Sequence, residues 1–128
     1  MRVLLDTHAY FWWETDDPKL SARAREVIAT GTTTVLVSAV TAWELANKVR
    51  SGKWPAAAIL AKDIETALRE ASFEPLPLTI EHARLAGFLP GPHRDPFDRM
   101  LAAQAQVENA PLITADWAFR AFGTRVLW

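Results

Sequence analysis

Apolar positions along the chain fall into short continuous runs separated by longer stretches with a helical period. The short runs predict buried strands at residues 3–5, 33–37, 73–76, 112–114 and 125–127. Apolar residues three or four positions apart predict helices over residues 21–30, 42–49, 55–71, 79–86 and 97–105. The stretch AYFWWE at 9–14 is apolar without a clear period, so the pattern assigns it no element.

Residues at the ends of these segments support the predicted helices. Ser21 is suited to cap the helix that begins there, and Asp95 followed by Pro96 has the pattern of an N-cap and a first helical position. Thr41 and Glu44 have the spacing of a capping box, which predicts that a helix begins at Thr41.

The alternation of strands and helices predicts an α/β fold of three layers, a central, mostly parallel β-sheet flanked by helices. The segment 73–76 contains Pro75 and is therefore expected at the edge of the sheet. The length of 128 residues suits a single domain over residues 1–128. In such sheets ligands bind beyond the carboxyl ends of the strands, so functional residues are expected directly after strands.

Composition narrows the chemistry. The chain has no cysteine, which excludes disulfides, thiolate zinc sites and cysteine nucleophiles. Any metal ion must therefore be bound by carboxylates or by His8, His82 and His93. No apolar run approaches the roughly 18–20 residues that cross a bilayer, and the first run is ended by Asp6. We therefore expect a cytoplasmic protein that makes no membrane contact.

Five acidic residues lie where chemistry is expected, and each also has a structural interpretation. Asp6 and Asp116 follow predicted strands, where aspartate is a common turn or capping residue. Glu44 completes the predicted capping box. Asp95 and Asp98 occupy the cap and third position of a predicted helix, near the positive end of its dipole.

The combination of these acids favours a metal site over five separate structural roles. Asp6, Glu44, Asp98 and Asp116 are all expected near the same end of the sheet, where their carboxylates would repel one another without a counter-charge. Several carboxylates without a histidine or cysteine set are the ligands that hard divalent cations require. The residues therefore predict a site for Mg²⁺ or Mn²⁺.

Four longer segments resemble a known family. They are LLDTHAYFWW from residue 4, AWELANKVRSGK from 42, PLTIEHARLAGFLPGPHRDPFDRMLAAQA from 77 and LITADWAFRAFGTRVL from 112. In this order they resemble PIN-domain proteins and, more narrowly, the VapC-type toxins of bacterial toxin–antitoxin pairs. The resemblance covers nearly the whole chain and implies a PIN-like fold.

The resemblance also implies a ribonuclease site in which four acids bind Mg²⁺ or Mn²⁺. The positions that match these catalytic, metal-binding acids are Asp6, Glu44, Asp98 and Asp116. Thr114 fits a Ser/Thr position of the family that orients a water or a ligand. Asp95 is a further accessory candidate, with an equally strong interpretation as a helix cap.

Such a site predicts a metal-dependent endoribonuclease that hydrolyses RNA phosphodiester bonds. A divalent cation lowers the pKa of a bound water and offsets charge that builds on the phosphodiester oxygens. In-line attack then depends on positioning and electrostatics. Glu44 or Asp116 is a candidate to accept the proton of the attacking water.

Basic residues are expected around the acids, where they would hold RNA phosphates. Although the net charge is −1, the 14 basic residues outnumber the acidic residues that remain once the five acids are set aside. The alternative interpretation of each of these basic residues is that it lies on a solvated helix face. The predicted RNA-binding residues are Lys48, Arg50, Lys53, Arg94 and Arg99.

The six tryptophans are expected mainly in the core or in subunit contacts. Trp12, Trp13, Trp54 and Trp128 are not all expected to fit one core, which leaves apolar surface for partners. The resemblance implies a homodimer and a cognate antitoxin protein, a segment of which blocks the active-site groove.

Two other functional classes compete. One is another metal-dependent phosphohydrolase on an acidic α/β site, such as a haloacid-dehalogenase-like phosphatase. That class has an Asp-x-Asp motif at the first strand, whereas Asp6 is followed by Thr7 and His8. The other is a non-catalytic PIN-like RNA-binding module, which is expected to lack one or more of the four acids.

Overall fold

The computed structural model of the chain describes residues 1–92 and 94–128. In this part of the chain, five parallel strands form one sheet in the order β3-β2-β1-β4-β5. The predicted α/β fold class is confirmed, and β3 lies at the sheet edge as predicted. The strands are β1 (Arg2–Leu5), β2 (Thr34–Ser38), β3 (Glu74–Leu76), β4 (Leu112–Ile113) and β5 (Val126–Leu127).

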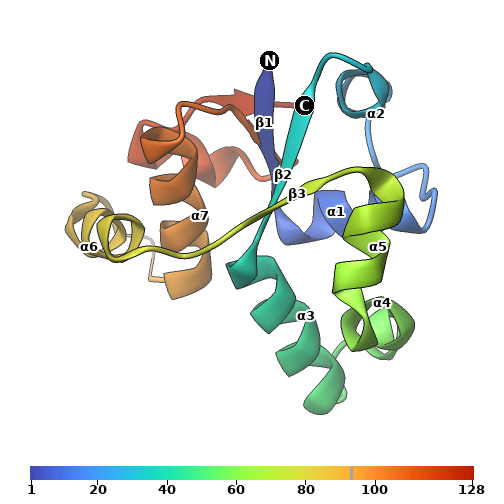
Figure 1. The fold of residues 1–128 in the computed structure, drawn as a ribbon. Helices are drawn as coiled ribbons and strands as arrows, with labels where there is room; N and C mark the ends of the chain where they lie inside the picture. Colours follow the sequence, from blue (N-terminus) through green and yellow to red (C-terminus); the bar gives the residue numbers. More distant parts are fainter. Residues whose placement is uncertain (93) are drawn as a thin grey trace.

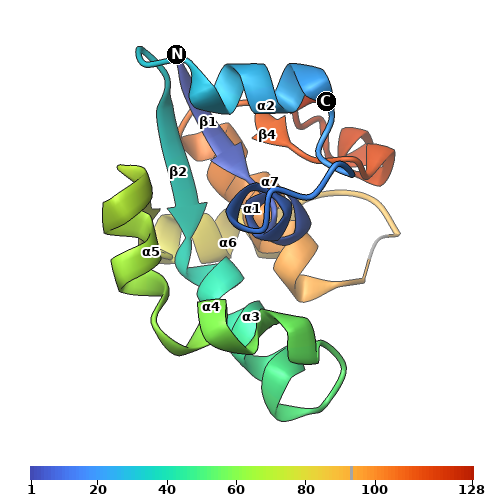
Figure 2. The same cartoon turned by 90° about the vertical axis from the view of Figure 1, so that its right-hand side faces the viewer.

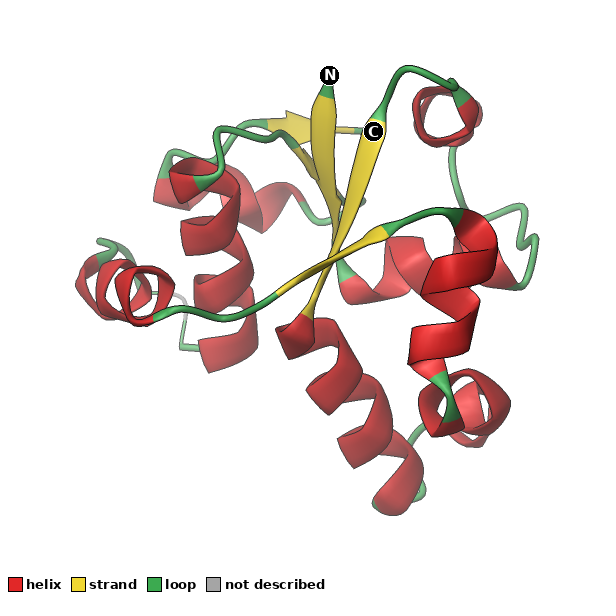
Figure 3. Cartoon of the chain, viewed as in Figure 1, coloured by secondary structure: helices red, strands yellow, loops and turns green. Residues whose placement is uncertain are grey.

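Helices cover both faces of this sheet. Figure 1 shows α6 and α7 on one side of the strands and α1, α2, α4 and α5 on the other, while α3 continues from the end of β2. Figure 2 views the second face, with α1 and α2 in front of the strands, and Figure 3 shows the same layers by element type. The helices are α1 (Thr7–Glu14), α2 (Ala22–Ala29), α3 (Ala39–Arg50), α4 (Ala58–Lys62), α5 (Ile64–Ala71), α6 (Ile80–Phe88) and α7 (Pro96–Val107), with 3₁₀ turns η1 (Pro55–Ala57) and η2 (Trp117–Phe122).

The central strand β1 contributes to the core on both faces of the sheet. Val3 and Leu5 are fully buried in the cluster formed with α1, α2 and α5. Leu4 lies between them and is fully buried in the cluster formed with α6, α7 and η2. Side chains alternate between the faces of a strand, so a strand covered on both faces reads as a continuous apolar run.

Residues 9–14, for which the pattern predicted no element, form most of α1. The helix is capped by Asp6, whose side chain accepts a hydrogen bond from the backbone N–H of Ala9. Its apolar residues lie around most of its circumference, because both the sheet and the aromatic residues around it cover the helix. An all-round apolar helix has no helical period in its sequence.

The predicted capping box at the start of α3 is wrong. The helix begins at Ala39, directly after β2, and its cap is Ser38, whose hydroxyl accepts a hydrogen bond from the N–H of Val40 at 2.9 Å. Thr41 is therefore inside the first turn, and Glu44 lies in the second turn. The start of α3 at Ala39 sets how far from the sheet Glu44 lies.

The predicted continuous helix over residues 55–71 is broken in the structure. Asp63 has φ −148° and ψ 63°, which ends α4, and its carboxylate caps α5 by accepting from the N–H and hydroxyl of Thr66. Aspartate competes for nearby backbone donors in this way. Ile59, whose spacing from Leu60 and Ile64 would place it on the apolar face of a continuous helix, is 90% exposed.

Other predicted helix starts are confirmed. Ser21 caps α2, Thr79 caps α6, and Asp95 caps α7 with Pro96 in the first turn. Within residues 1–92 and 94–128, none of the helices combines the length and hydropathy needed to span a membrane.

A buried polar network fixes α7 against the start of α3. Gln104 of α7 is fully buried, and its Oε1 accepts a hydrogen bond from the hydroxyl of Ser38 at 2.5 Å. Its Nε2 donates to the carbonyl of Pro77 at 3.3 Å. The imidazole of His82 lies beside the same amide and contacts Glu108 at 3.0 Å. His82 therefore has a structural role.

We expect Gln104→Met to lower the free energy of unfolding by roughly 1–3 kcal/mol, because it leaves the buried Ser38 hydroxyl without this acceptor. Chemical denaturation measures the effect. Ser38→Ala should lower the free energy of unfolding by less in the Gln104→Met chain than in the wild type, because each change removes the same hydrogen bond between Ser38 and Gln104. Strictly additive losses would contradict the network.

Candidate active site

The carboxyl ends of β1 and β4 are adjacent where the order of the strands reverses. Asp6 follows β1 and Thr114 follows β4, and the Thr114 hydroxyl donates a hydrogen bond to Asp6 Oδ2 at 2.5 Å. This is the position at which open α/β sheets bind ligands. The fold thus brings together two residues that lie at opposite ends of the chain.

Asp6 is a buried carboxyl group that faces other acids. It is 9% exposed, and its Oδ1 accepts a hydrogen bond from the N–H of Ala9 at 2.8 Å. Burial raises its pKa to about 6, against the lowering effect of the hydrogen bonds from Thr114 and Ala9. The charges of Asp98 and Glu44 raise the pKa further. A nearby cation would relieve this cost of ionisation.

Glu44 comes from the second turn of α3 and is held by two contacts. Its Oε1 accepts a hydrogen bond from the hydroxyl of Thr7 at 2.6 Å, and the Thr7 and Thr41 hydroxyls lie 3.2 Å apart. Its Oε2 forms an ion pair with Lys48 at 2.9 Å, as expected from their i, i+4 spacing. A metal ion at Glu44 would compete with the Lys48 ammonium.

The remaining acids are arranged around the starts of α7 and η2. Asp95 caps α7 by accepting from the N–H groups of Phe97 and Asp98, which confirms its structural interpretation. Asp98 is half-buried in the first turn of α7. Asp116 is exposed and caps η2 through the N–H of Ala118 at 2.9 Å.

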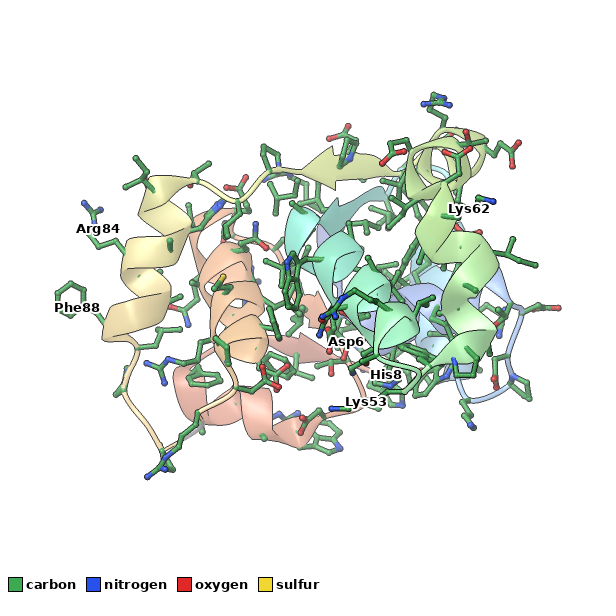
Figure 4. The ribbon with its side chains drawn as sticks, turned by 90° about the horizontal axis from the view of Figure 1, so that it is seen from below. Asp6, His8, Lys53, Lys62, Arg84 and Phe88 are labelled. Atoms are coloured by element: carbon green, nitrogen blue, oxygen red, sulfur yellow. The ribbon has the colours of Figure 1, made fainter. Side chains whose placement is uncertain are left out.

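All five acids line one pocket of about 180 Å³. Thr114 holds two of them, because its hydroxyl oxygen also accepts from the N–H of Asp116 at 3.0 Å. The view from below the sheet in Figure 4 shows Asp6, His8 and Lys53 in this region. The residues that line the pocket are Asp6, Thr7, His8, Glu44, Lys48, Asp95, Asp98, Leu101, Asp116 and Phe119.

The donor set of this pocket suits a hard divalent cation. Within the described residues, no three histidine or acidic groups are gathered as they would be around a metal ion. The pocket nevertheless offers carboxylate oxygens around a buried aspartate whose ionisation is opposed by burial and by neighbouring acids, and such oxygen donors are the ligands that Mg²⁺ and Mn²⁺ require. Asp6, Glu44, Asp98 and Asp116 are the residues that would hold the ion.

The predicted RNA-binding residues differ in what their side chains contact. Lys48 lines the pocket, and Lys53 and Arg94 are exposed. Arg50 donates a hydrogen bond to Asn47 Oδ1 at 2.7 Å. Arg99 instead donates to the carbonyls of Ala86 and Leu89 at the end of α6. These contacts give Arg99 a structural role in holding α6 and α7 together. RNA binding by the five basic residues stays a prediction.

The expectation about the tryptophans is wrong in detail. Trp12, Trp13, Trp54 and Trp128 all pack, partly buried, against one core cluster. The exposed indoles are Trp43 and Trp117, each 53% exposed. Burial depends on contacts between distant residues, such as the rings of Trp12 and Trp128 at 5.9 Å, which no local pattern predicts.

The ring contacts of His8 were not predicted from the sequence. Its imidazole stacks on Trp54 at a centroid distance of 4.8 Å. Burial and the charge of Lys48 lower its pKa. The signal available in the sequence was only its spacing of two residues from Asp6. His93, named above with His8 and His82 as a histidine that could bind a metal ion, lies outside the described residues.

Comparisons with known proteins agree with this fold. The PIN domain family profile matches residues 3–124. The fold resembles VapBC2 from Rickettsia felis, with a TM-score of 0.74, 19% identity and coverage of 99% of this chain and 98% of that one. For FitAcB from Neisseria gonorrhoeae the TM-score is 0.68 at 22% identity, covering 100% and 97%.

A third similar structure is VapC20 from Mycobacterium tuberculosis, with a TM-score of 0.68, 16% identity and coverage of 95% of each chain. Comparison of the sequence with curated proteins finds no match. At these identities the solved structures establish the fold alone, whereas the family profile covers nearly all of the chain. The chain therefore belongs to the PIN domain family.

Proposed function

We propose that the chain is a metal-dependent endoribonuclease and the toxin of a VapBC-type toxin–antitoxin pair. The observation that carries the proposal is the convergence of Asp6, Glu44, Asp98 and Asp116 on one pocket at the switch point of the sheet. Membership of the PIN domain family supports a nuclease. One similar structure, VapC20, is described as a toxin that cleaves the sarcin–ricin loop.

The residues of the pocket suit hydrolysis of a phosphodiester bond. A bound Mg²⁺ or Mn²⁺ would supply positive charge to the phosphodiester oxygens and acidify an attacking water. Asp6 is held rigidly by Ala9 and Thr114, which suits a group that positions others. Asp116 is exposed and uses Oδ1 to cap η2, so its Oδ2 is available to accept a proton.

We also propose that the chain pairs with a second copy and with an antitoxin protein. An apolar pocket of about 310 Å³ lies between α3 and α7, and Trp43 stacks on Phe97 at its edge. Trp43 is 53% exposed, and Leu78 in the same pocket is 39% exposed. Exposed apolar surface of this kind marks contacts with partners. The antitoxin would block the acidic pocket by inserting a basic side chain.

The proposed reaction is tested by cleavage of a labelled single-stranded RNA. We expect cleavage with Mg²⁺ or Mn²⁺, no cleavage in EDTA, and recovery when Mg²⁺ is added back.

Asp98→Asn should abolish cleavage. Asp95→Ala should retain cleavage and lose about 1 kcal/mol of stability, because it removes the cap of α7. Undiminished cleavage in EDTA would refute the metal mechanism, and activity lost only at Asp95 would reverse the two assignments.

Without metal, the stability of the protein should depend on the charge of Asp6. Because its pKa is raised to about 6 from 3.8, its contribution to stability is complete below pH 3.8 and is lost as the pH rises through 6. In EDTA at pH 7.5 we therefore expect the free energy of unfolding of Asp6→Asn to exceed that of the wild type by up to roughly 3 kcal/mol, which a higher unfolding temperature would report. The advantage should disappear near pH 4; an equal difference at both values would contradict the assignment.

The second copy is tested by light scattering. We expect a particle of about twice the 14.3 kDa mass of the chain at micromolar concentration. Trp43→Glu should give monomers, because it places a charge in the apolar pocket between α3 and α7. Trp117→Glu is the matched control, since Trp117 is equally exposed and lies outside that pocket. A wild-type monomer would refute the pairing.

A further inference from the structure

The acidic pocket has few hydrogen-bond donors for an anionic substrate. Among the described side chains that line it, Thr7, His8 and Lys48 carry N–H or O–H groups. The hydroxyl of Thr7 donates to Glu44, and the ammonium of Lys48 is paired with the same carboxylate. The ring nitrogens of His8 make no hydrogen bond to a described residue. His8 is therefore the lining donor that is not committed to Glu44.

The ring of His8 is held in a fixed orientation. It stacks on Trp54 with an interplanar angle of 26°, and Trp12 lies against it at a centroid distance of 5.6 Å. Lys48 Nζ lies 5.6 Å from the centroid of the same Trp54 ring. The stack on Trp54 occupies one face of the imidazole and leaves its edge, which carries the nitrogens. His8 is exposed and lines the acidic pocket.

This geometry suits a contact with a phosphate and not with a nucleobase. A base would bind by stacking on an aromatic face, and one face of His8 is already stacked on Trp54, with the tilted ring of Trp12 beside it. A phosphate oxygen needs a donor directed at it, and an imidazole carries at least one N–H in either charge state. The contact therefore does not depend on protonation of the ring.

Resting on the proposed ribonuclease function, we infer that His8 is an RNA-binding residue that donates a hydrogen bond to a phosphate oxygen of the bound strand. Trp54 is the positioning residue that holds the ring toward the pocket. The hydrogen bond offsets part of the repulsion between the RNA backbone and the carboxylates, and it orients the strand relative to Asp6. It requires no metal contact from the imidazole.

The experiment compares His8→Phe, which retains the aromatic stack without a donor, with His8→Gln, which retains a donor. Binding of a fluorescein-labelled single-stranded RNA is measured in the non-cleaving Asp98→Asn chain, and cleavage is measured in the otherwise wild-type chain. We expect His8→Phe to weaken binding and raise KM about tenfold, the size of one hydrogen bond to a charged group, with kcat changed less. His8→Gln should recover part of the loss.

Two controls separate this contact from general effects. The increase in unfolding temperature caused by Mg²⁺ should be the same for His8→Phe as for the wild type, because His8 is not a ligand. Arg84→Gln should leave binding unchanged, since Figure 4 shows Arg84 on the outer side of α6, away from Asp6 and His8.

Each outcome decides the inference. Unchanged RNA binding and KM for His8→Phe, in a chain that otherwise binds and cleaves RNA, would overturn the role of His8 alone. Loss of the Mg²⁺ effect would also overturn it, by making His8 part of the metal site. A wild-type chain that neither binds nor cleaves RNA would overturn the proposed function, and the inference with it.

Discussion

The hydrogen bond from Thr114 to Asp6 joins the carboxyl ends of β1 and β4 at the point where the order of the strands reverses. It keeps a carboxyl group in place inside the protein, where burial and neighbouring acids oppose its charge. The same threonine accepts the N–H of Asp116 and so sets the start of η2. One short contact between the two ends of the chain therefore aligns two of the four acids.

The other two acids depend on how α3 and α7 are joined. Ser38 ends β2 and caps α3, and its hydroxyl donates a hydrogen bond to Gln104 of α7. Further from the sheet, Trp43 stacks on Phe97 at 4.8 Å, next in sequence to Glu44 and Asp98 respectively. The two helices are thus connected at two levels. Loss of either connection would change the separation of Glu44 and Asp98 without touching their carboxylates.

The strands and the positions of the acids that follow them could be predicted from the sequence, because both depend on the order of residues within a short segment. A short apolar run followed by an acid predicts a strand end, and Asp6 and Asp116 were located by that rule. The predicted start of α3 was wrong, because Ser38 is both the last residue of β2 and the cap of α3. The contact of His8 with Trp54 joins residues on separate elements, and no periodicity encodes such a pair.

The central claim is that the convergent carboxylates bind a divalent cation at the switch point of the sheet. The most direct measurement is the anomalous scattering of crystals soaked in Mn²⁺. The account predicts a peak bordered by Asp6 and Asp98 and by at least one of Glu44 and Asp116. It would be contradicted by crystals that show no peak in the acidic pocket at Mn²⁺ concentrations that support RNA cleavage.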